Sequence, residues 1–359
     1  MQTTARVATG GTVLKPLPLS YILPLRWTDD AELDDLTAYL GGLAPLVDEV
    51  IVVDGSPEPL FATHRDAWSR HVTHVAPDPR LDFVMGKVNG VDTGVRMARN
   101  EGVIIADDDV RYGRPELAQM VEALERSHLV RPHNVFAPRP WHARWDTGRI
   151  LLNRAVNGDY PGTLGVRASC YRAIDGYDGD VMFENLELIR SVEAAGGVVT
   201  TAFDILVERR PPTTSHFLGQ RVRQAYDDFT LPPRMALFLS VAPAVALAAV
   251  KRRPQLIVAG AAAAVAVAER GRRRAGAARA FERFAALAAP LWVSERAVTA
   301  WLAVGQRLFR GGTTYGETTI ARSATPPREL RARLAGLAPP LTPLQATDPV
   351  KADREAVAA

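Results

Sequence analysis

The chain has 359 residues, long enough for one large or two ordinary domains, and its apolar content of 47% supports a sizeable core. Its single cysteine, Cys170, excludes an intramolecular disulfide and any metal site built from several cysteines, and it fits a reducing compartment. The first 12 residues lack the basic and then apolar order of a signal peptide, so we expect residues 1–18 to form a flexible arm.

The net charge of +3 is unevenly distributed along the chain. Residues 231–330 carry 15 Lys and Arg against 5 Glu and no Asp, so the rest of the chain sums to −7. This change in charge along the chain predicts a domain boundary near Thr230. A basic and apolar segment favours an anionic membrane surface over nucleic acid, because its basic stretches lack the interleaved aromatic residues that stack on bases.

Apolar runs alternate with helical patterns through the first hundred residues. The apolar runs predict short buried strands at residues 21–25, 49–53 and 71–76. The spacing of leucines and small residues predicts helices at residues 29–46, 57–70 and 86–100. This alternation predicts parallel strands in an α/β sheet, in which ligands bind beyond the carboxyl ends of the strands.

The most informative segment is Asp107-Asp108-Asp109, which follows an apolar strand predicted at 102–106. Adjacent carboxylates at the end of a buried strand are costly unless a cation neutralises them. Oxygen ligands suit Mg²⁺ or Mn²⁺, which commonly hold phosphate oxygens; a solvated acidic turn is the alternative. Asp54 also ends a predicted strand, where it can accept hydrogen bonds from a base or ribose or can cap the next helix. Two strand ends therefore indicate one metal-diphosphate site.

The middle of the chain continues the alternation. Helical spacing predicts helices at 116–127 and 184–195, and apolar runs predict strands at 134–138 and 166–171. Trp141 and Trp145 lie between these elements. They either offer an apolar platform for a sugar ring or lipid, or pack in the core.

Three apolar segments make up the basic part of the chain. Residues 235–250 and 254–268 contain no charge over 16 and 15 residues, fewer than the roughly 20 that a perpendicular bilayer crossing needs. Residues 284–309 mix apolar, charged and tryptophan residues, as in a helix lying among lipid headgroups. We expect a hydrophobic, membrane-associated helical region at 231–320, either spanning or re-entrant, and a polar, proline-rich tail at 321–359. An Ala-rich soluble bundle is the alternative.

Several short motifs occur in a recognisable order. They are the strand end Val52–Ser56, the glycine-patterned Gly86–Ala98, the D-x-D-like Ala106–Asp109, Phe183–Glu187 at the place of an E-D motif, and Gln220–Gln224 as a degraded Q-x-x-R-W motif. Together they resemble the family 2 inverting glycosyltransferases with the GT-A fold, over residues 19–229. The segments around Pro290 and Gly311 are similar to membrane-bound, actinobacterial-type members that glycosylate lipids.

The resemblance implies an α/β GT-A domain at residues 19–230, with a Rossmann-like and mostly parallel central sheet, followed by an all-α, apolar, membrane-associated region. It also implies a nucleotide-diphosphate sugar as donor and Mg²⁺ or Mn²⁺ as cofactor. The candidate donor-binding residues are Asp54, Lys87, Asp107, Gln220 and Arg223, and the candidate metal ligands are Asp109 and Asp107.

Physical arguments support some of these roles and leave others open. Lys87, with the amide groups of the first helical turn, can meet a phosphate, but a solvated surface lysine is the alternative. An arginine fork matches diphosphate oxygens, which favours Arg223, with Arg221 as its competitor and an ordinary basic helix face as the alternative. We assign Asp109 to the metal and Asp107 to the ribose or sugar as well as the metal.

Inversion at the anomeric carbon needs a base that takes the proton of the acceptor hydroxyl. The matching motif normally supplies a carboxylate at the position of Asn185, and an amide cannot accept the proton. Glu184 and Glu187 are the substitutes, because residues three apart on a helix share roughly one face. We favour Glu184. The alternative is that Glu184 only caps the helix and Glu187 faces solvent.

With the resemblance, the sequence predicts a metal-dependent hexosyltransferase at the cell membrane, with its catalytic domain on the cytoplasmic side. The predicted acceptor is a lipid or lipid-linked hydroxyl of the cell envelope, and no nucleic acid is bound. A non-catalytic nucleotide-binding membrane protein is one alternative, and Asn185 is its best argument. A nucleotidyltransferase is another, disfavoured because no glycine-rich basic loop follows the first strand.

Overall fold

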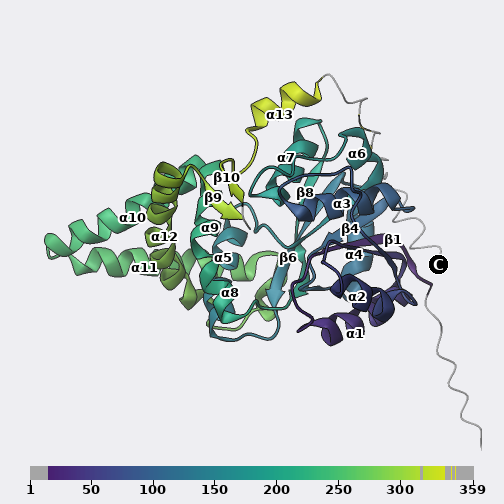
Figure 1. Cartoon of the computed structure of the whole chain (residues 1–359). Coiled ribbons are helices and arrows are strands. Elements are labelled where there is room, and N and C mark those ends of the chain that lie inside the picture. Colours follow the sequence, from purple (N-terminus) through teal and green to yellow (C-terminus); the bar gives the residue numbers. More distant parts are fainter. Residues whose placement is uncertain (1–14, 316–317, 336–340, 342–343, 345–359) are drawn as a thin grey trace, which may run out of the picture.

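The computed structural model describes residues 15–315 and 318–335, together with residues 341 and 344. An α/β domain lies beside a region of long helices, two of which form a hairpin that projects from the rest of the molecule (Figure 1). The predicted arm up to residue 14 and the predicted tail from residue 345 onward fall outside the described residues.

An eight-stranded sheet forms the centre of the α/β domain, in the order β3-β2-β1-β4-β7-β6-β8-β5. Its strands are β1 (Leu17–Leu25), β2 (Val47–Asp54), β3 (Thr73–Val75), β4 (Gly102–Ala106), β5 (Val110–Arg111), β6 (Leu129–Phe136), β7 (Thr163–Arg167) and β8 (Val199–Arg209). Strands β3, β2, β1 and β4 run parallel, as do β6 and β8. Strand β7 is antiparallel to β4 and β6, and β5 is antiparallel to β8, so the sheet is mixed.

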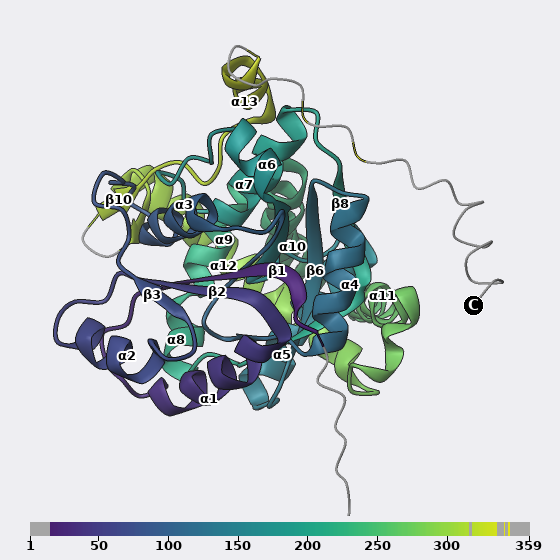
Figure 2. The ribbon, with the colours of Figure 1, turned by 90° about the vertical axis from the view of Figure 1, so that its right-hand side faces the viewer.

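Helices cover both faces of the sheet because its central strands are apolar on both sides. Alternate residues of β1 point to opposite faces, so Ile22 belongs to one core and Leu23 to the other. Figure 2 shows α3 (Gly86–Met97), α6 (Ala168–Ala173) and α7 (Glu184–Ala194) on the first face. The second core contains residues of α1 (Leu33–Leu43), α2 (Leu60–Trp68) and α4 (Arg114–Glu125).

Two glycines let α3 approach the sheet closely. A Cβ on Gly90 would lie 2.8 Å from the Cβ of Pro24, and a Cβ on Gly94 would overlap the side chain of Ile22. The small residues on one face of this helix therefore permit the close approach. As a result, Lys87 in the first turn of α3 lies next to the end of β4.

The strand predicted at 166–171 is wrong in its bounds. Strand β7 ends at Arg167, and the N–H of Ala168 then donates to the carbonyl oxygen of Glu101 at 2.8 Å as the chain enters α6. The sequence predicts no element at α5 (Trp141–Ala155) or β8, both of which the structure forms. Polar residues such as Asp146 and Arg154 are among the buried residues of α5, so this helix has no clear apolar stripe to recognise.

The region of long helices contains α10 (Pro232–Val250), α11 (Pro254–Arg273) and α12 (Ala289–Arg310). Among the helices that the structure describes, α10 is the one long and apolar enough to cross a membrane, judged by length and composition. A small antiparallel hairpin of β9 (Thr313–Tyr315) and β10 (Thr318–Ile320) follows α12. The expectation that residues 231–320 form an entirely helical region is therefore wrong at this hairpin.

Part of the predicted tail is folded against the α/β domain. Helix α13 (Pro327–Leu334) buries Leu330 and Leu334, and Leu334 packs in the same core as α7. Just before α13, the N–H of Thr325 donates to a carboxylate oxygen of Glu187 at 2.6 Å. The chain thus returns to the α/β domain after the long helices.

The long helices also pack directly on the α/β domain. Trp292 and Arg296 of α12 are buried, and Arg296 donates to the carbonyl oxygen of Gln224 at 2.5 Å. Helix α11 crosses α5 at Gly271, where any Cβ would overlap the carbonyl oxygen of Leu151. This crossing fixes the base of the helical hairpin.

We expect Gly271→Ala to destabilise the protein by about 1–3 kcal/mol, because the added methyl group must push α11 away from α5. Gly260→Ala is the matched control, since nothing lies within 4 Å of a Cβ at this position of the same helix. There the substitution should stabilise the helix by about 0.5–1 kcal/mol. Chemical denaturation of both variants measures the difference. Equal stability of the two would show that the crossing does not need glycine.

Candidate active site

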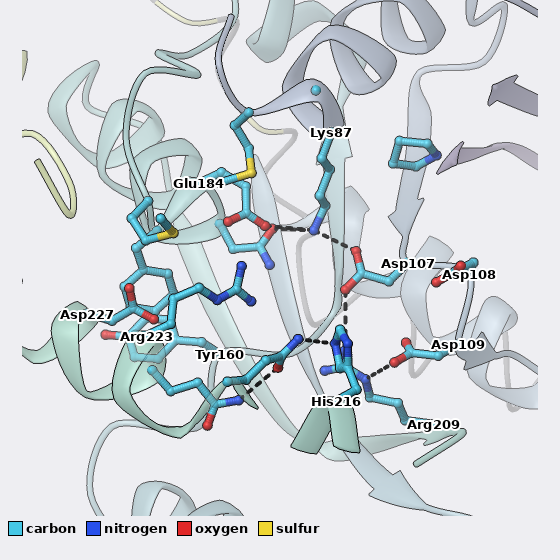
Figure 3. A pocket seen from close by; sticks show the side chains of 18 of the residues that line it. Lys87, Asp107, Asp108, Asp109, Tyr160, Glu184, Arg209, His216, Arg223 and Asp227 are labelled. Atoms are coloured by element: carbon cyan, nitrogen blue, oxygen red, sulfur yellow. Dashed lines mark hydrogen bonds and ion pairs between the residues drawn. The ribbon is translucent and has the colours of Figure 1, made fainter. Parts of the chain in front are cut away.

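A cleft of about 570 Å³ opens beyond the end of β4, and most of the predicted site residues line it. Its walls come from the end of β4, the start of α3, the start of α7, the end of β8, and the segment from α8 (Thr214–Gly219) and α9 (Arg221–Tyr226) to the start of α10. The α/β domain and the helical region therefore both contribute to it. Figure 3 shows the charged side chains that point into the cleft.

The side chains of the Asp triplet point in two directions. Asp107 and Asp109 both face Arg209, at 3.5 and 2.8 Å. Asp108 instead accepts a hydrogen bond from the indole N–H of Trp27 at 2.5 Å. The alternation leaves two carboxylates, two residues apart, on the same side of the chain.

Asp109 has a carboxylate oxygen without a partner in the described part of the chain. Its Oδ2 accepts from Arg209, whereas its Oδ1 is buried and makes no hydrogen bond. Burial raises the pKa of Asp109 to about 6, although the guanidinium of Arg209 opposes the shift. A buried oxygen ligand beside a second carboxylate fits a hard divalent cation such as Mg²⁺ or Mn²⁺.

Lys87 connects two walls of the cleft. Its ammonium group lies 2.6 Å from Asp107 and 2.8 Å from Glu184. Burial opposes the charge, but the attraction of the two carboxylates outweighs it and raises the pKa of Lys87. Lys87 is thus not the solvated surface residue that sequence analysis left open. It brings the E-D-like segment next to the Asp triplet.

The two predicted base candidates lie in different surroundings. Glu184 lines the cleft and is bound by Lys87, whereas Glu187 is fully buried outside the cleft, where it accepts the hydrogen bond from Thr325. The geometry therefore disagrees with a catalytic assignment of Glu187, and equally with its exposure to solvent. Asn185 lines the cleft and donates to the carbonyl oxygen of Pro161 at 3.2 Å.

Asp54 does not line the cleft, contrary to the expectation that both strand ends face one site. Its side chain is buried and accepts from the N–H of Ser56 at 2.8 Å, so it does not cap the next helix either. Its other oxygen lies 2.6 Å from the ring of His64 and 3.0 Å from that of His74. These three side chains could hold a metal by residue type, but their ligand atoms already bond one another. At this strand end it is the next residue, Gly55, that lines the cleft.

Gln220 and Arg223 line the cleft as expected. Gln220 contacts the ring of His216, and Arg223 makes no ion pair within the described residues. The competitor Arg221 is buried outside the cleft, with Asp146 at 3.2 Å.

The paired tryptophans do not line the cleft either. Trp141 and Trp145 pack against Phe217, so they do not form a platform there. Their packing supports the core alternative that sequence analysis left open for Trp145, while Trp141 stays half exposed.

Two site residues were missed by sequence analysis. Arg209 lies at the end of β8, a strand that was not recognised, so nothing in the sequence drew attention to it. Asp227 follows α9 and lines the cleft, with a buried Oδ1 that has no partner among the described residues. Burial raises the pKa of Asp227 to about 8, against the attraction of Arg223. No pattern in the sequence singled it out.

The sequence matches no family model and no curated protein. Among solved structures, the chain resembles a mannosyltransferase from Pyrobaculum calidifontis in complex with GDP-Man and Mn²⁺, with a TM-score of 0.53 and 17% identity, over 82% of this chain and 89% of that one. This likeness shows that the chain has a glycosyltransferase fold of the GT-A type.

Two further matches score too low to carry an argument. Glucosyl-3-phosphoglycerate synthase from Mycobacterium tuberculosis has a TM-score of 0.38 and 15% identity, over 56% of this chain and 74% of that one. TarS of S. aureus has a TM-score of 0.40 and 12% identity, over 55% of this chain and 60% of that one.

Replacing Asp227 by Asn should change how stability depends on pH. Because burial raises its pKa to about 8, above the roughly 3.9 of an unfolded Asp, the unfolded chain loses this proton first as the pH rises. The Asp227 contribution to wild-type stability should therefore fall between about pH 4 and pH 8, and Asp227→Asn should lack that fall. We therefore expect the Tm of the variant minus the Tm of the wild type to become larger by a few degrees as the pH rises from about 4 to 8. A difference that does not vary with pH would contradict the assignment.

Proposed function

We propose that this chain is a metal-dependent, inverting glycosyltransferase of the family 2 type, with a nucleotide-diphosphate sugar as donor. The observation that carries the proposal is the gathering of Asp107 and Asp109 with Lys87, Arg209 and Arg223 in one cleft. Carboxylates hold a divalent cation, and guanidinium and ammonium groups match the oxygens of a diphosphate. The GT-A fold, shared with a mannosyltransferase solved with GDP-Man and Mn²⁺, supports the same function.

Asp107 and Asp109 are the residues that would hold Mg²⁺ or Mn²⁺. The unpartnered oxygen of Asp109 supports this assignment. When bound, the ion supplies stabilisation of the negative charge on the departing diphosphate. Lys87 and Arg209 add fixed positive charge beside it, and Arg223, which makes no ion pair within the described chain, is positioned to bind the diphosphate oxygens.

In the proposed reaction, an acceptor hydroxyl attacks the anomeric carbon from the face opposite the diphosphate. The bond to the diphosphate oxygen breaks, its electron pair leaves with the diphosphate, and the configuration inverts. A carboxylate in the cleft wall takes the hydroxyl proton. Glu184 is one of several carboxylates that line the cleft.

A non-catalytic nucleotide-binding protein is the second candidate, favoured by Asn185 at the position where the motif has a carboxylate. Hydrolysis of GDP-mannose or UDP-glucose, with water as the acceptor and with or without Mn²⁺, separates the two functions. Metal-dependent hydrolysis supports the enzyme, whereas donor binding without any turnover supports the second candidate.

Asp109→Ala should abolish metal-dependent donor binding, because the variant loses the buried oxygen ligand. We expect GDP-mannose or UDP-glucose with Mn²⁺ to stabilise the wild type by about 2.7 kcal/mol at a donor concentration of roughly 100 times Kd, and to leave the variant unchanged. Thermal shift measures both. Asn185→Ala is the matched control and should retain donor binding. Equal donor affinity in wild type and Asp109→Ala would remove the metal from the proposal.

We further propose that the helical region attaches the protein to an anionic membrane. Of the 21 large apolar side chains exposed among the described residues, 16 lie between Leu237 and Phe309, so the apolar surface is concentrated on α10, α11 and α12. No acidic residue occurs between Asp228 and Glu269, and Lys251 to Arg253 form the tip of the hairpin. Such a surface suits lipid tails flanked by anionic headgroups.

The position of the cleft supports a lipid or lipid-linked acceptor. Leu231 and Arg234, at the start of α10, line the cleft, so an acceptor embedded beside this helix could reach the donor. An apolar groove of about 740 Å³ lies between α10, α11 and the start of α12, with Lys251 and Arg253 at its end. Such a groove suits a lipid chain. The single cysteine is consistent with a catalytic domain on the reducing, cytoplasmic side.

We expect the double substitution Val250→Glu and Leu256→Glu to weaken binding to phosphatidylglycerol-containing vesicles by on the order of tenfold or more. Both side chains are exposed, at 78% and 55%, so the fold should tolerate the change. Val198→Glu, at an exposed position on the α/β domain, is the control and should bind as the wild type does. Vesicle sedimentation measures all three. Unchanged sedimentation of the double variant would argue against attachment through the hairpin.

A further inference from the structure

One carboxylate in the cleft differs from all the others. Six carboxylates of the described residues line it. Five of them have partners. Asp107 forms ion pairs with Lys87 and Arg209, Asp109 with Arg209, and Glu184 with Lys87. Asp228 forms ion pairs with Arg234 and Arg296, and Asp108 accepts a hydrogen bond from Trp27. Asp227 makes no side-chain hydrogen bond or ion pair within the described parts of the chain. It is therefore the carboxylate left available to a substrate.

The position of Asp227 suits contact with an acceptor. It is the first residue of the short helix Asp227–Thr230, which connects α9 to α10. Leu231, which follows this helix, also lines the cleft, so the helical region meets the cleft here. Figure 3 shows Asp227 on the opposite side of the pocket from the Asp triplet, with Arg223 extending from that side toward the middle. A base for inversion must lie across the anomeric carbon from the diphosphate. Asp227 and the proposed metal ligands satisfy this arrangement.

The surroundings of Glu184 make it a poor base. Its carboxylate forms an ion pair with Lys87 at 2.8 Å, and that lysine also binds Asp107. A carboxylate in an ion pair with a buried ammonium group is stabilised in its charged form. If it took a proton, the ion pair would be lost. Glu184 therefore positions Lys87 against the Asp triplet.

On the basis of the proposed function, we propose that Asp227 is the general base of the transfer. It would replace the carboxylate that the motif normally has at the position of Asn185. Its carboxylate takes the proton of the acceptor hydroxyl while the hydroxyl oxygen forms the bond to the anomeric carbon. The bond between that carbon and the diphosphate breaks, and the electron pair leaves on the diphosphate. The proton then passes from Asp227 to solvent.

The charges around Asp227 set the pH range in which it can act. Burial raises its pKa to about 8, and Arg223 of α9 and Arg296 of α12 lower it, while Glu184 of α7 and the adjacent Asp228 raise it. A carboxylate with a pKa near neutral pH is a stronger base than an exposed one. It must be ionised to act, so the rate should rise with pH and level off above about pH 8.

Hydrolysis of GDP-mannose or UDP-glucose by the full-length chain with Mn²⁺ tests the proposal without knowledge of the acceptor, because water then supplies the proton. Asp227→Asn should lower kcat by about 10²–10⁴-fold, leave the donor Kd within about twofold, and remove the rise of rate with pH. Asp66→Asn, at an exposed carboxylate of α2, is the matched control with wild-type behaviour.

Azide separates a base from a structural residue. It is an anion that needs no deprotonation, so it should restore turnover of Asp227→Ala and give a glycosyl azide. Undiminished hydrolysis by Asp227→Asn, or a rate loss that azide does not restore, would overturn the assignment while the proposed function stands. A wild type that neither binds nor hydrolyses any donor would overturn both.

Discussion

The cleft depends on mutual neutralisation between its carboxylates and cations. Asp107, Asp109 and Glu184 lie close together, and Lys87 and Arg209 compensate their charge. These five residues come from α3, the turn after β4, α7 and β8, so ion pairing ties together elements that are distant in sequence. Unpaired, any one of them would carry a large desolvation cost. The close approach of α3 through Gly90 and Gly94 is what allows Lys87 to take part.

The parts of the site that follow an apolar strand or a glycine pattern could be predicted from the sequence. Strand β4 and the triplet after it are local features, because burial of Val103 to Ala106 is visible as an apolar run. The helix that carries Lys87 is equally visible in its spacing. Arg209 could not be found in this way. It ends β8, whose first half is only partly buried and whose residues give no simple alternation.

Asp54 illustrates a limit of reasoning from strand ends. Sequence position places it at the carboxyl edge of the sheet, as expected, but the direction of its side chain depends on two histidines. His64 of α2 and His74 of β3 lie 20 residues or fewer from it and turn its carboxylate away from the cleft. Asp227 is the converse case. No periodic pattern marks it, and its importance comes from the partners that it lacks in the fold.

The segment after the long helices gives the helical region a structural role in the α/β domain. The N–H groups of Met182 and Phe183 donate to the carbonyl oxygens of Arg322 and Ser323, at 3.0 and 2.7 Å, immediately before Glu184. The N–H of Thr325 also compensates the buried carboxylate of Glu187. Residues beyond the long helices thus complete the backbone pairing that orients one wall of the cleft. The α/β domain is consequently incomplete without the segment that follows the long helices. A truncation before the long helices would therefore leave backbone donors of this wall without their acceptors.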